Sequence, residues 1–265
     1  MKKIFVFLVF IFLISCQKIE DNIVAHFIAH AGGEIDGNFY TNSLEGLNLS
    51  YSKGCRLFEL DFLETSDGKI VAAHDWEHYK TITNFPQEKI DNQPLAEQEF
   101  LEQKIMGKYT PLNMAAVNRW FSKHSDAILV TDKINEPKKF ISENGFEFRD
   151  RLIMELFSWN AVNEAIECGI TPMPSDNLVF SDSDPNRETV KQILLNSSIK
   201  YVCCSVRLVE DNRDFLHFLK EKGIKVYVFH VNFDNGIDEK FVWDNYRNVI
   251  FGMYADNLDL LTKLK

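Results

Sequence analysis

The sequence lacks a surplus of basic residues. Its 265 residues include 29 lysines and arginines against 39 aspartates and glutamates, a formal net charge of −10, and its isoelectric point is near 5.2. Nucleic-acid binders need clustered lysines and arginines, because contacts to phosphates supply most of their affinity. No such cluster occurs in this chain. The composition therefore argues against a nucleic-acid partner.

Cysteine is also scarce. Apart from Cys16 near the N-terminus, the chain has four cysteines, at positions 55, 168, 203 and 204. Four is a low count for a disulfide-based scaffold, and the adjacent pair Cys203 and Cys204 cannot bond to each other without strain. We interpret all four as small apolar residues of the core.

The N-terminal apolar run is too short to cross a membrane comfortably. It extends from Ile4 to Ile14, follows two lysines and precedes Ser15 and Cys16, which is the layout of a signal peptide. The letters LISC resemble a bacterial lipobox, in which the cysteine becomes the lipidated N-terminus. The alternative is an ordinary signal peptide with a chance cysteine.

This N-terminal layout predicts a destination and three segments. We expect residues 1–16 to be a signal peptide with a lipobox, residues 17–25 a tether, and residues 26–265 one folded domain. The protein is then an exported lipoprotein, anchored at Cys16 and facing the periplasm or the cell surface.

The sequence also lacks the glycine-rich loops GxGxxG and GxxxxGK[ST] that nucleotide-binding sheets use. Strand-like apolar runs instead alternate with helix-like segments through the domain. The runs are 26–31, 56–62, 127–133, 151–157, 177–181, 199–206, 224–231 and 248–255. Eight such units in about 240 residues predict a parallel, closed (β/α)₈ TIM barrel rather than an open doubly wound sheet.

One connection, residues 77–110, is longer than the others. Loops of this length are uncommon unless they are functional or have internal structure. Because it follows the second strand on the side where such barrels carry their chemistry, we expect a lid or a substrate-shaping subdomain. The alternative is a decoration without a function.

The second predicted strand carries two acids on one face. Successive strand side chains point to opposite faces, so Phe58, Leu60 and Phe62 share one side while Glu59 and Asp61 share the other. The apolar side would pack on helices and the acids would point into the barrel. Two inward carboxylates repel each other unless a cation lies between them, and Mg²⁺ and Ca²⁺ prefer oxygen ligands. The alternative is a solvated or arginine-paired face.

Other polar residues also stand at strand ends. The first strand ends at His30, a short excursion after the second ends at His74, and the third ends at Asp132 and Lys133. Two histidines beside an acid pair can act as general acid and base; the alternative is a pair of structural histidines. If the strand continued, Lys133 would face away from Asp132. The remaining histidines, at 26, 78, 124 and 217, are expected to be structural or solvated.

These segments carry a family resemblance. IAHAGG, TNSLEGL and GCRLFELDFLETSDGKIVAAHDW resemble the glycerophosphodiester phosphodiesterase family, whose pattern runs His-Arg-Gly, Glu-Asn-Thr, Glu-x-Asp, Thr-x-Asp-Gly and His-Asp. Near the C-terminus, GIKVYVFHVN and GMYADN echo the last strands of the family. The resemblance implies a barrel, a Mg²⁺ or Ca²⁺ ion held by Glu59 and Asp61, and His30 and His74 as the acid and base.

The resemblance also suggests the surrounding residues. Asp132 is our candidate for the third metal ligand, and Asn42, Lys133 and His230 are our candidates for substrate binding. Two departures stand out: Ala31 replaces an arginine that binds phosphate in the family, and Lys133 is adjacent to Asp132 where the family spaces its acid and lysine by one residue.

Two classes of function remain open. The first is a metal-dependent phosphodiesterase that hydrolyses glycerophosphodiesters, or a related phosphodiester, to an alcohol and glycerol phosphate; a phosphatidylinositol phospholipase C-like lyase is a close variant. Its substrate would be a small phosphodiester or a lipid head group. The second is a catalytically silent lipoprotein that binds such a ligand on the same barrel, which the two departures favour.

Overall fold

The computed structural model describes residues 22–180 and 184–265. The predicted signal peptide, the lipidation at Cys16 and most of the tether lie outside these residues. Within them, none of the helices combines the length and the apolar character that crossing a bilayer requires.

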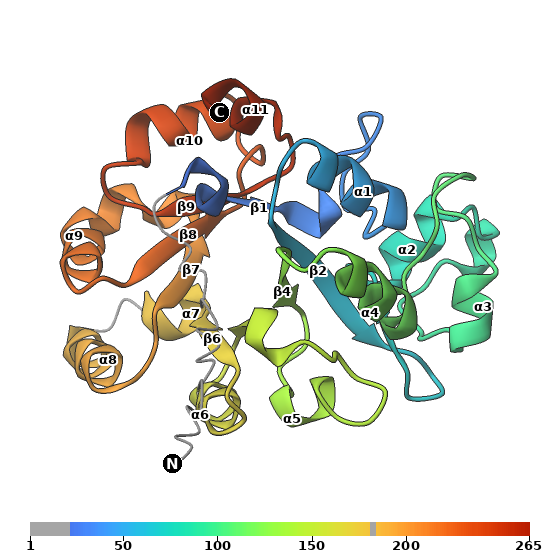
Figure 1. Cartoon of the computed structure of the whole chain (residues 1–265), viewed down its shortest axis with the longest axis horizontal. Coiled ribbons are helices and arrows are strands. Elements are labelled where there is room, and N and C mark those ends of the chain that lie inside the picture. The colour runs from blue at the N-terminus through green and yellow to red at the C-terminus, as the bar shows by residue number, and fades with distance from the viewer. Residues whose placement is uncertain (1–21, 181–183) are drawn as a thin grey trace, which may run out of the picture.

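Eight parallel strands form a nearly closed barrel with helices around it (Figure 1). The strands are β1 (Phe27–Ala29), β2 (Leu57–Glu64), β4 (Ile128–Asp132), β5 (Leu152–Leu156), β6 (Thr171–Pro174), β7 (Tyr201–Ser205), β8 (Lys225–Phe229) and β9 (Gly252–Ala255). Their hydrogen-bonded order is β6-β5-β4-β2-β1-β9-β8-β7, and the short β3 (Ile70–Ala72) runs antiparallel to the end of β2. This architecture confirms the predicted TIM barrel.

The helices begin where the sequence supplies capping side chains. The side chains of Ser43, Asn113, Ser158 and Asp238 each accept a hydrogen bond from a backbone N–H of the following first turn. The helices are α1 (Leu44–Ser52), α2 (Trp76–Ile82), α3 (Glu97–Leu101), α4 (Met114–Lys123), α5 (Pro137–Phe140), α6 (Trp159–Glu167), α7 (Asp176–Val179), α8 (Asp184–Asn196), α9 (Arg213–Glu221), α10 (Glu239–Tyr246) and α11 (Asp259–Leu264). Short 3₁₀ turns cover Ile23–His26, His30–Gly32, Gln87–Lys89, Arg149–Arg151, Val206–Leu208 and Glu210–Asn212.

The predicted fifth strand is wrong. Residues 177–181 lie mostly in α7, and the strand is β6, whose sequence is TPMP. Proline lacks the N–H that a central strand donates, so two prolines argued against a strand there. In the structure β6 pairs with β5 on one side and stands at the opening of the barrel on the other. Pro172 and Pro174 are compatible with that edge position.

The two faces of β2 behave as its alternation predicts. Phe58 packs edge-on against Trp120 of α4, and Phe62 against Phe140 of α5, each with ring centroids 4.9 Å apart. The barrel interior holds a separate apolar cluster, made of Ile28, Leu57, Val130, Ile153, Met173, Cys203, Tyr227 and Tyr254. Glu59 and Asp61 lie on this inner face, at the carboxyl ends of the strands.

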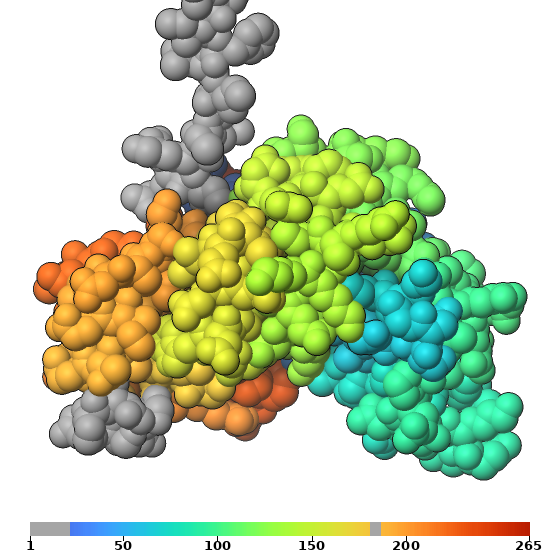
Figure 2. Space-filling view, turned by 90° about the horizontal axis from the view of Figure 1, so that it is seen from below, coloured from blue at the N-terminus to red at the C-terminus, as the bar shows by residue number. Residues whose placement is uncertain are grey.

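The insertion that follows β3 has its own small core. Helices α2 and α3 and the loops around them bury Trp76, Tyr79, Ile82, Leu95, Phe100, Ile105 and Tyr109, together with Ile35, Val71 and Ala73. Figures 1 and 2 place this segment, coloured blue-green, at one edge of the molecule. Its role as a lid or as a substrate-shaping element stays a prediction.

Candidate active site

Three carboxylates meet at the carboxyl ends of two neighbouring strands. Glu59 and Asp61 come from β2 and Asp132 ends β4, where the register pairs it with Asp61. One oxygen atom from each of the three lies within 4.8 Å of the others. Glu59 and Asp61 are each only 1 % exposed. The sheet register therefore brings together the three predicted metal ligands.

The carboxylate cluster is electrostatically costly without a cation. Burial raises the pKa of Glu59 well above its ordinary value, and the charges of Asp61 and Asp132 raise it further. Burial and Asp132 also raise the pKa of Asp61. The Oε1 atom of Glu59 is buried and has no hydrogen-bond partner among the described residues. A buried, unpartnered oxygen within a set of hard oxygen donors fits Mg²⁺ or Ca²⁺.

The residues around the cluster hold these acids in place. The backbone N–H of Ala31 donates to Oε2 of Glu59 at 2.7 Å. The Asn42 amide donates to Oδ2 of Asp61 at 2.9 Å and accepts from the Asp61 backbone N–H at 3.0 Å. Both ends of this buried amide are thus used inside the protein. These contacts position Asp61, and the expected substrate-binding role of Asn42 stays a prediction.

His30 stands at the end of β1 beside the carboxylates. Its Nδ1 is 2.9 Å from Oδ1 of Asp256, a residue that follows β9. Burial by itself would lower the pKa of His30, but the hydrogen bond and charge of Asp256, with the charges of Asp61 and Asp132, outweigh burial, and the pKa is raised. With Nδ1 bound to Asp256, Nε2 is the nitrogen that can act on a ligand.

His74 has a carboxylate partner of its own. Its Nδ1 is 2.7 Å from Oδ2 of Asp75, whose other oxygen caps α2 by accepting the backbone N–H of His78 at 2.7 Å. The ring of Tyr40 lies between the two histidines, with centroid distances of 4.6 Å to His30 and 5.2 Å to His74. The two candidate acid/base groups are therefore neighbours, each oriented by a carboxylate.

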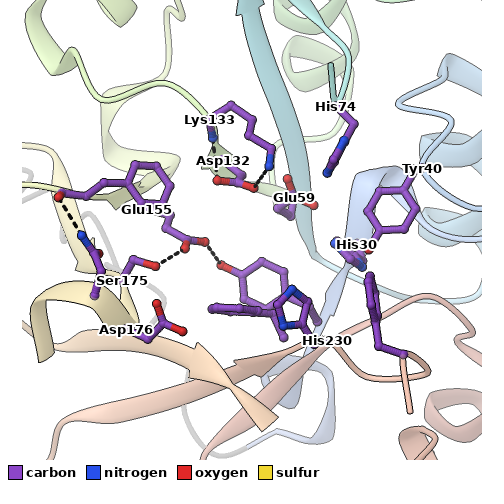
Figure 3. Close-up of a pocket in the computed structure, with 15 residues that line it drawn as sticks. His30, Tyr40, Glu59, His74, Asp132, Lys133, Glu155, Ser175, Asp176 and His230 are labelled. Carbon is purple, nitrogen blue, oxygen red and sulfur yellow. Dashed lines mark hydrogen bonds and ion pairs between the residues drawn. The ribbon is translucent and has the colours of Figure 1, made fainter. Parts of the chain in front are cut away.

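These groups open into one cavity of about 710 Å³ (Figure 3). Six of the predicted site residues line it: His30, Glu59, His74, Asp132, Lys133 and His230. Asp61 is nearly fully buried. The cavity lies at the carboxyl ends of the barrel strands, where enzymes of this architecture carry out their chemistry.

Lys133 does not follow the strand alternation that the sequence suggested. The strand β4 ends at Asp132, and Lys133 has a φ of +67°, which is the left-handed region. Its side chain turns back so that Nζ lies 3.6 Å from Oδ2 of Asp132, inside the cavity lining. The expectation that Lys133 faces away is therefore wrong. It supplies a cation at the mouth of the acid cluster.

His230 follows β8 and is held by a neighbouring hydroxyl. Its Nδ1 is 3.1 Å from the Oγ of Ser205, at the end of β7. Burial and then the charge of Arg207 lower its pKa. Both effects favour the uncharged form of the His230 imidazole. Of the other histidines, His26 and His124 bond backbone carbonyls, as expected of structural residues, whereas His78 lies against Tyr40 and His74.

The sequence reasoning missed Glu155. It is the fourth residue of β5, 5 % exposed, and lines the cavity. Its carboxylate accepts hydrogen bonds from Ser175 at 2.6 Å and from the Tyr254 hydroxyl at 2.9 Å. Burial, with the charge of Asp132, raises its pKa to about 7. The available signal in the sequence was the single acid inside the apolar run LIMEL.

Glu155 should make the metal-free protein less stable as the pH rises. Its folded pKa is about 7, above the ordinary 4.5, so between these values the folded state holds a proton that the unfolded state has lost. Stability therefore falls across this window, by on the order of 3 kcal/mol from this residue. Glu155→Gln should flatten the profile of unfolding free energy between pH 5 and 8, measured by denaturant titration. The exposed Glu143→Gln is the control, and equal slopes for Glu155→Gln and wild type would contradict the assignment.

Comparisons with known proteins give structural relatives only. No family model matches the sequence, and no curated protein matches it. The fold is similar to a glycerophosphodiester phosphodiesterase from Thermotoga maritima, with a TM-score of 0.69, 19 % identity, and 91 % of this chain and 98 % of that one covered. A glycerophosphodiester phosphodiesterase from Parabacteroides distasonis has a TM-score of 0.64 and 17 % identity, with 90 % of this chain and 95 % of that one covered. An Oleispira antarctica phosphodiesterase, solved with its product sn-glycerol-3-phosphate, has a TM-score of 0.65 and 17 % identity, with 87 % of this chain and 92 % of that one covered.

Proposed function

We propose that this protein is a metal-dependent phosphodiesterase that hydrolyses a glycerophosphodiester, or a related phosphodiester, to an alcohol and glycerol phosphate. One observation carries the proposal: two histidines, each oriented by a carboxylate, line the same cavity as Glu59 and Asp132, two members of the cluster of three carboxylates. The structural similarity to glycerophosphodiester phosphodiesterases supports it.

Six residues of the site have a part in this reaction. Glu59, Asp61 and Asp132 would hold Mg²⁺ or Ca²⁺, which supplies charge stabilisation to the phosphoryl oxygens. Lys133 adds a positive charge beside Asp132, where the phosphodiester anion would bind. Nε2 of one histidine takes the proton from the attacking hydroxyl, and Nε2 of the other gives a proton to the leaving alcohol.

The attacking hydroxyl can belong to the substrate. A glycerol hydroxyl next to the phosphate is held close to phosphorus, and such intramolecular attack can be favoured by about 7–11 kcal/mol. The product is then a cyclic phosphate. A phosphatidylinositol phospholipase C-like lyase would release this compound, and a hydrolase would open it with water.

A silent binding protein is the competing proposal, and it rests on the missing arginine. Ala31 is fully buried and its backbone serves Glu59, so no cation stands at position 31. Lys133, whose side chain reaches the cavity, offsets this loss. We therefore favour the enzyme.

A substrate panel tests the proposal. The full-length protein in detergent should hydrolyse glycerophosphodiesters, lose activity in EDTA and regain it when Mg²⁺ or Ca²⁺ is added. Phosphorus NMR of the products separates a cyclic phosphate from glycerol phosphate, and so separates the lyase from the hydrolase. Binding of the diesters without turnover under every metal condition would favour the silent protein.

We also propose that the protein is an exported lipoprotein anchored through Cys16. Residues before it have the layout of a signal peptide. Cys16→Ser should abolish lipidation and either release the protein into the soluble fraction or leave it unprocessed, as measured by fractionation and by mass spectrometry of the N-terminus. A processed Cys16→Ser protein that stays in the membrane would exclude the anchor.

A further inference from the structure

Tyr40 lies between the two candidate acid/base groups. It is half-buried, lines the cavity, and stands edge-on to both histidines, with ring centroids 4.6 Å from His30 and 5.2 Å from His74. Figure 3 shows Tyr40 beside the two histidines, with Lys133 on the far side of Glu59. In the proposed reaction both histidines act on oxygens bound to one phosphorus atom. A residue between them therefore adjoins the phosphoryl group.

The backbone of Tyr40 is strained. Its φ is +55°, in the left-handed region that bulky side chains seldom adopt. Residues in such conformations persist where the surrounding structure holds them, and they gather at functional sites. Tyr40 lines the cavity, whereas the preceding Phe39 is 44 % exposed. The strained turn thus accompanies a ring that is directed into the cavity.

Contacts from the insertion hold the loop that carries Tyr40. Asp36 of this loop accepts hydrogen bonds on Oδ2 from Lys108 Nζ at 2.6 Å and from the Tyr109 hydroxyl at 2.7 Å. The ring of His78, from α2, also lies against the Tyr40 ring, with centroids 6.4 Å apart. The position of Tyr40 is therefore set before a ligand binds.

The Tyr40 hydroxyl is an unused donor. Within the described part of the chain, no residue forms a hydrogen bond with it. Ser175 and Tyr254, the other hydroxyl residues of the cavity lining in that part, both donate to Glu155. Tyr40 thus offers a neutral O–H group that the protein itself leaves free.

The charges that act on this hydroxyl show which way it points. Burial, and then the charges of Asp256 and Glu59, raise the pKa of Tyr40. Charges on these carboxylates reach the hydroxyl because it is directed towards the acid cluster and not out of the cavity. A phenol whose ordinary pKa is near 10 is a hydrogen-bond donor at neutral pH.

We propose that the Tyr40 hydroxyl donates a hydrogen bond to an unesterified oxygen of the phosphate and stabilises the charge on that oxygen in the transition state. This role rests on the proposed function and adds a residue that touches the reacting group. Lys133, the only lysine or arginine among the described residues that line the cavity, is paired with Asp132. A neutral donor can therefore serve the phosphate without forming an ion pair with the surrounding carboxylates.

Tyr40→Phe isolates the hydroxyl, because it keeps the ring and its edge contacts. Its kcat on a glycerophosphodiester should fall by about 10²-fold, as for the loss of one preorganised donor, while its Tm stays that of wild type. Tyr51→Phe is the matched control and should keep wild-type kinetics, since the Tyr51 hydroxyl bonds Asp126, before the start of β4. A fall in Tm that accounts for the lost activity would make the Tyr40 hydroxyl structural and overturn the contact.

The leaving group separates a direct contact from an effect through the general acid. A diester with a nitrophenol leaving group needs no protonation, so it lessens any loss that acts through that acid. A contact with an unesterified oxygen does not depend on the leaving group, and Tyr40→Phe should stay about 10²-fold slower than wild type on this ester. Recovery of Tyr40→Phe would mean that the hydroxyl only positions the acid, and would overturn the contact.

Phosphate binding distinguishes a failure of the contact from a failure of the proposed function. Calorimetry with inorganic phosphate in Mg²⁺ should show at least about tenfold weaker binding to Tyr40→Phe, about 1.4 kcal/mol, and unchanged binding to Tyr51→Phe. Phosphate binding that depends on Tyr40, without cleavage of any diester, would overturn the phosphodiesterase and support the contact. Cleavage and phosphate binding that are equal in Tyr40→Phe and wild type would overturn the contact and leave the phosphodiesterase intact.

Discussion

Replacing His30 or His74 with alanine should lower kcat by about 10²–10⁴-fold, the usual contribution of a general acid or base. Both rings line the cavity and are fixed through Nδ1, by Asp256 and Asp75 respectively. Steady-state kinetics on a glycerophosphodiester measures the loss. His217→Ala, which removes an exposed histidine of α9, is the control and should keep wild-type turnover.

The leaving group then separates the roles of the two histidines. We assign His30 as the base and His74 as the acid. A diester with a nitrophenol leaving group needs no protonation, so it should partly restore the turnover of His74→Ala and not of His30→Ala. Equal restoration of both variants would refute this assignment, and undiminished turnover of either on the natural alcohol would remove that histidine from the mechanism.

Glu59→Gln should abolish divalent-metal binding and activity while leaving the metal-free protein at least as stable as wild type. Its carboxylate is buried beside Asp61 and Asp132, and its Oε1 has no hydrogen-bond partner among the described residues. Removing its charge relieves repulsion when no cation is present. A metal that binds only the folded state stabilises it by about 2.7 kcal/mol at a hundred times its Kd, so wild type should gain Tm with Mg²⁺ or Ca²⁺ and the variant should not.

Glu64→Gln is the matched control for Glu59→Gln. It makes the same change at the end of the same strand, where Glu64 pairs with Lys139 on the outside. It should keep both the metal-dependent gain in Tm and the activity. If Glu59→Gln instead kept full activity and metal response but lost much of its stability, Glu59 would have a structural role.

The sequence by itself determined the barrel and the position of most candidate site residues at one end of it. The two-residue period of β2 is local backbone geometry, so the burial of Phe58 and Phe62 against helices also predicts that Glu59 and Asp61 point inward. His30, His74 and Asp132 were readable because each ends an apolar run or follows one closely. Parallel strands then bring such ends to one rim, whatever the details of packing.

Tertiary structure decided the features that depend on contacts distant in sequence. Asp256 orients His30 from 226 residues away, and no local pattern encodes that pairing. The prolines of β6 are tolerated because of its place at the opening, which is a property of the whole sheet. Lys133 reaches the cavity because the backbone turns left-handed at its own position, which is where β4 stops. Burial and the charge of Asp132 together raise the pKa of Glu155, and both depend on β4 and β5 lying side by side in the barrel.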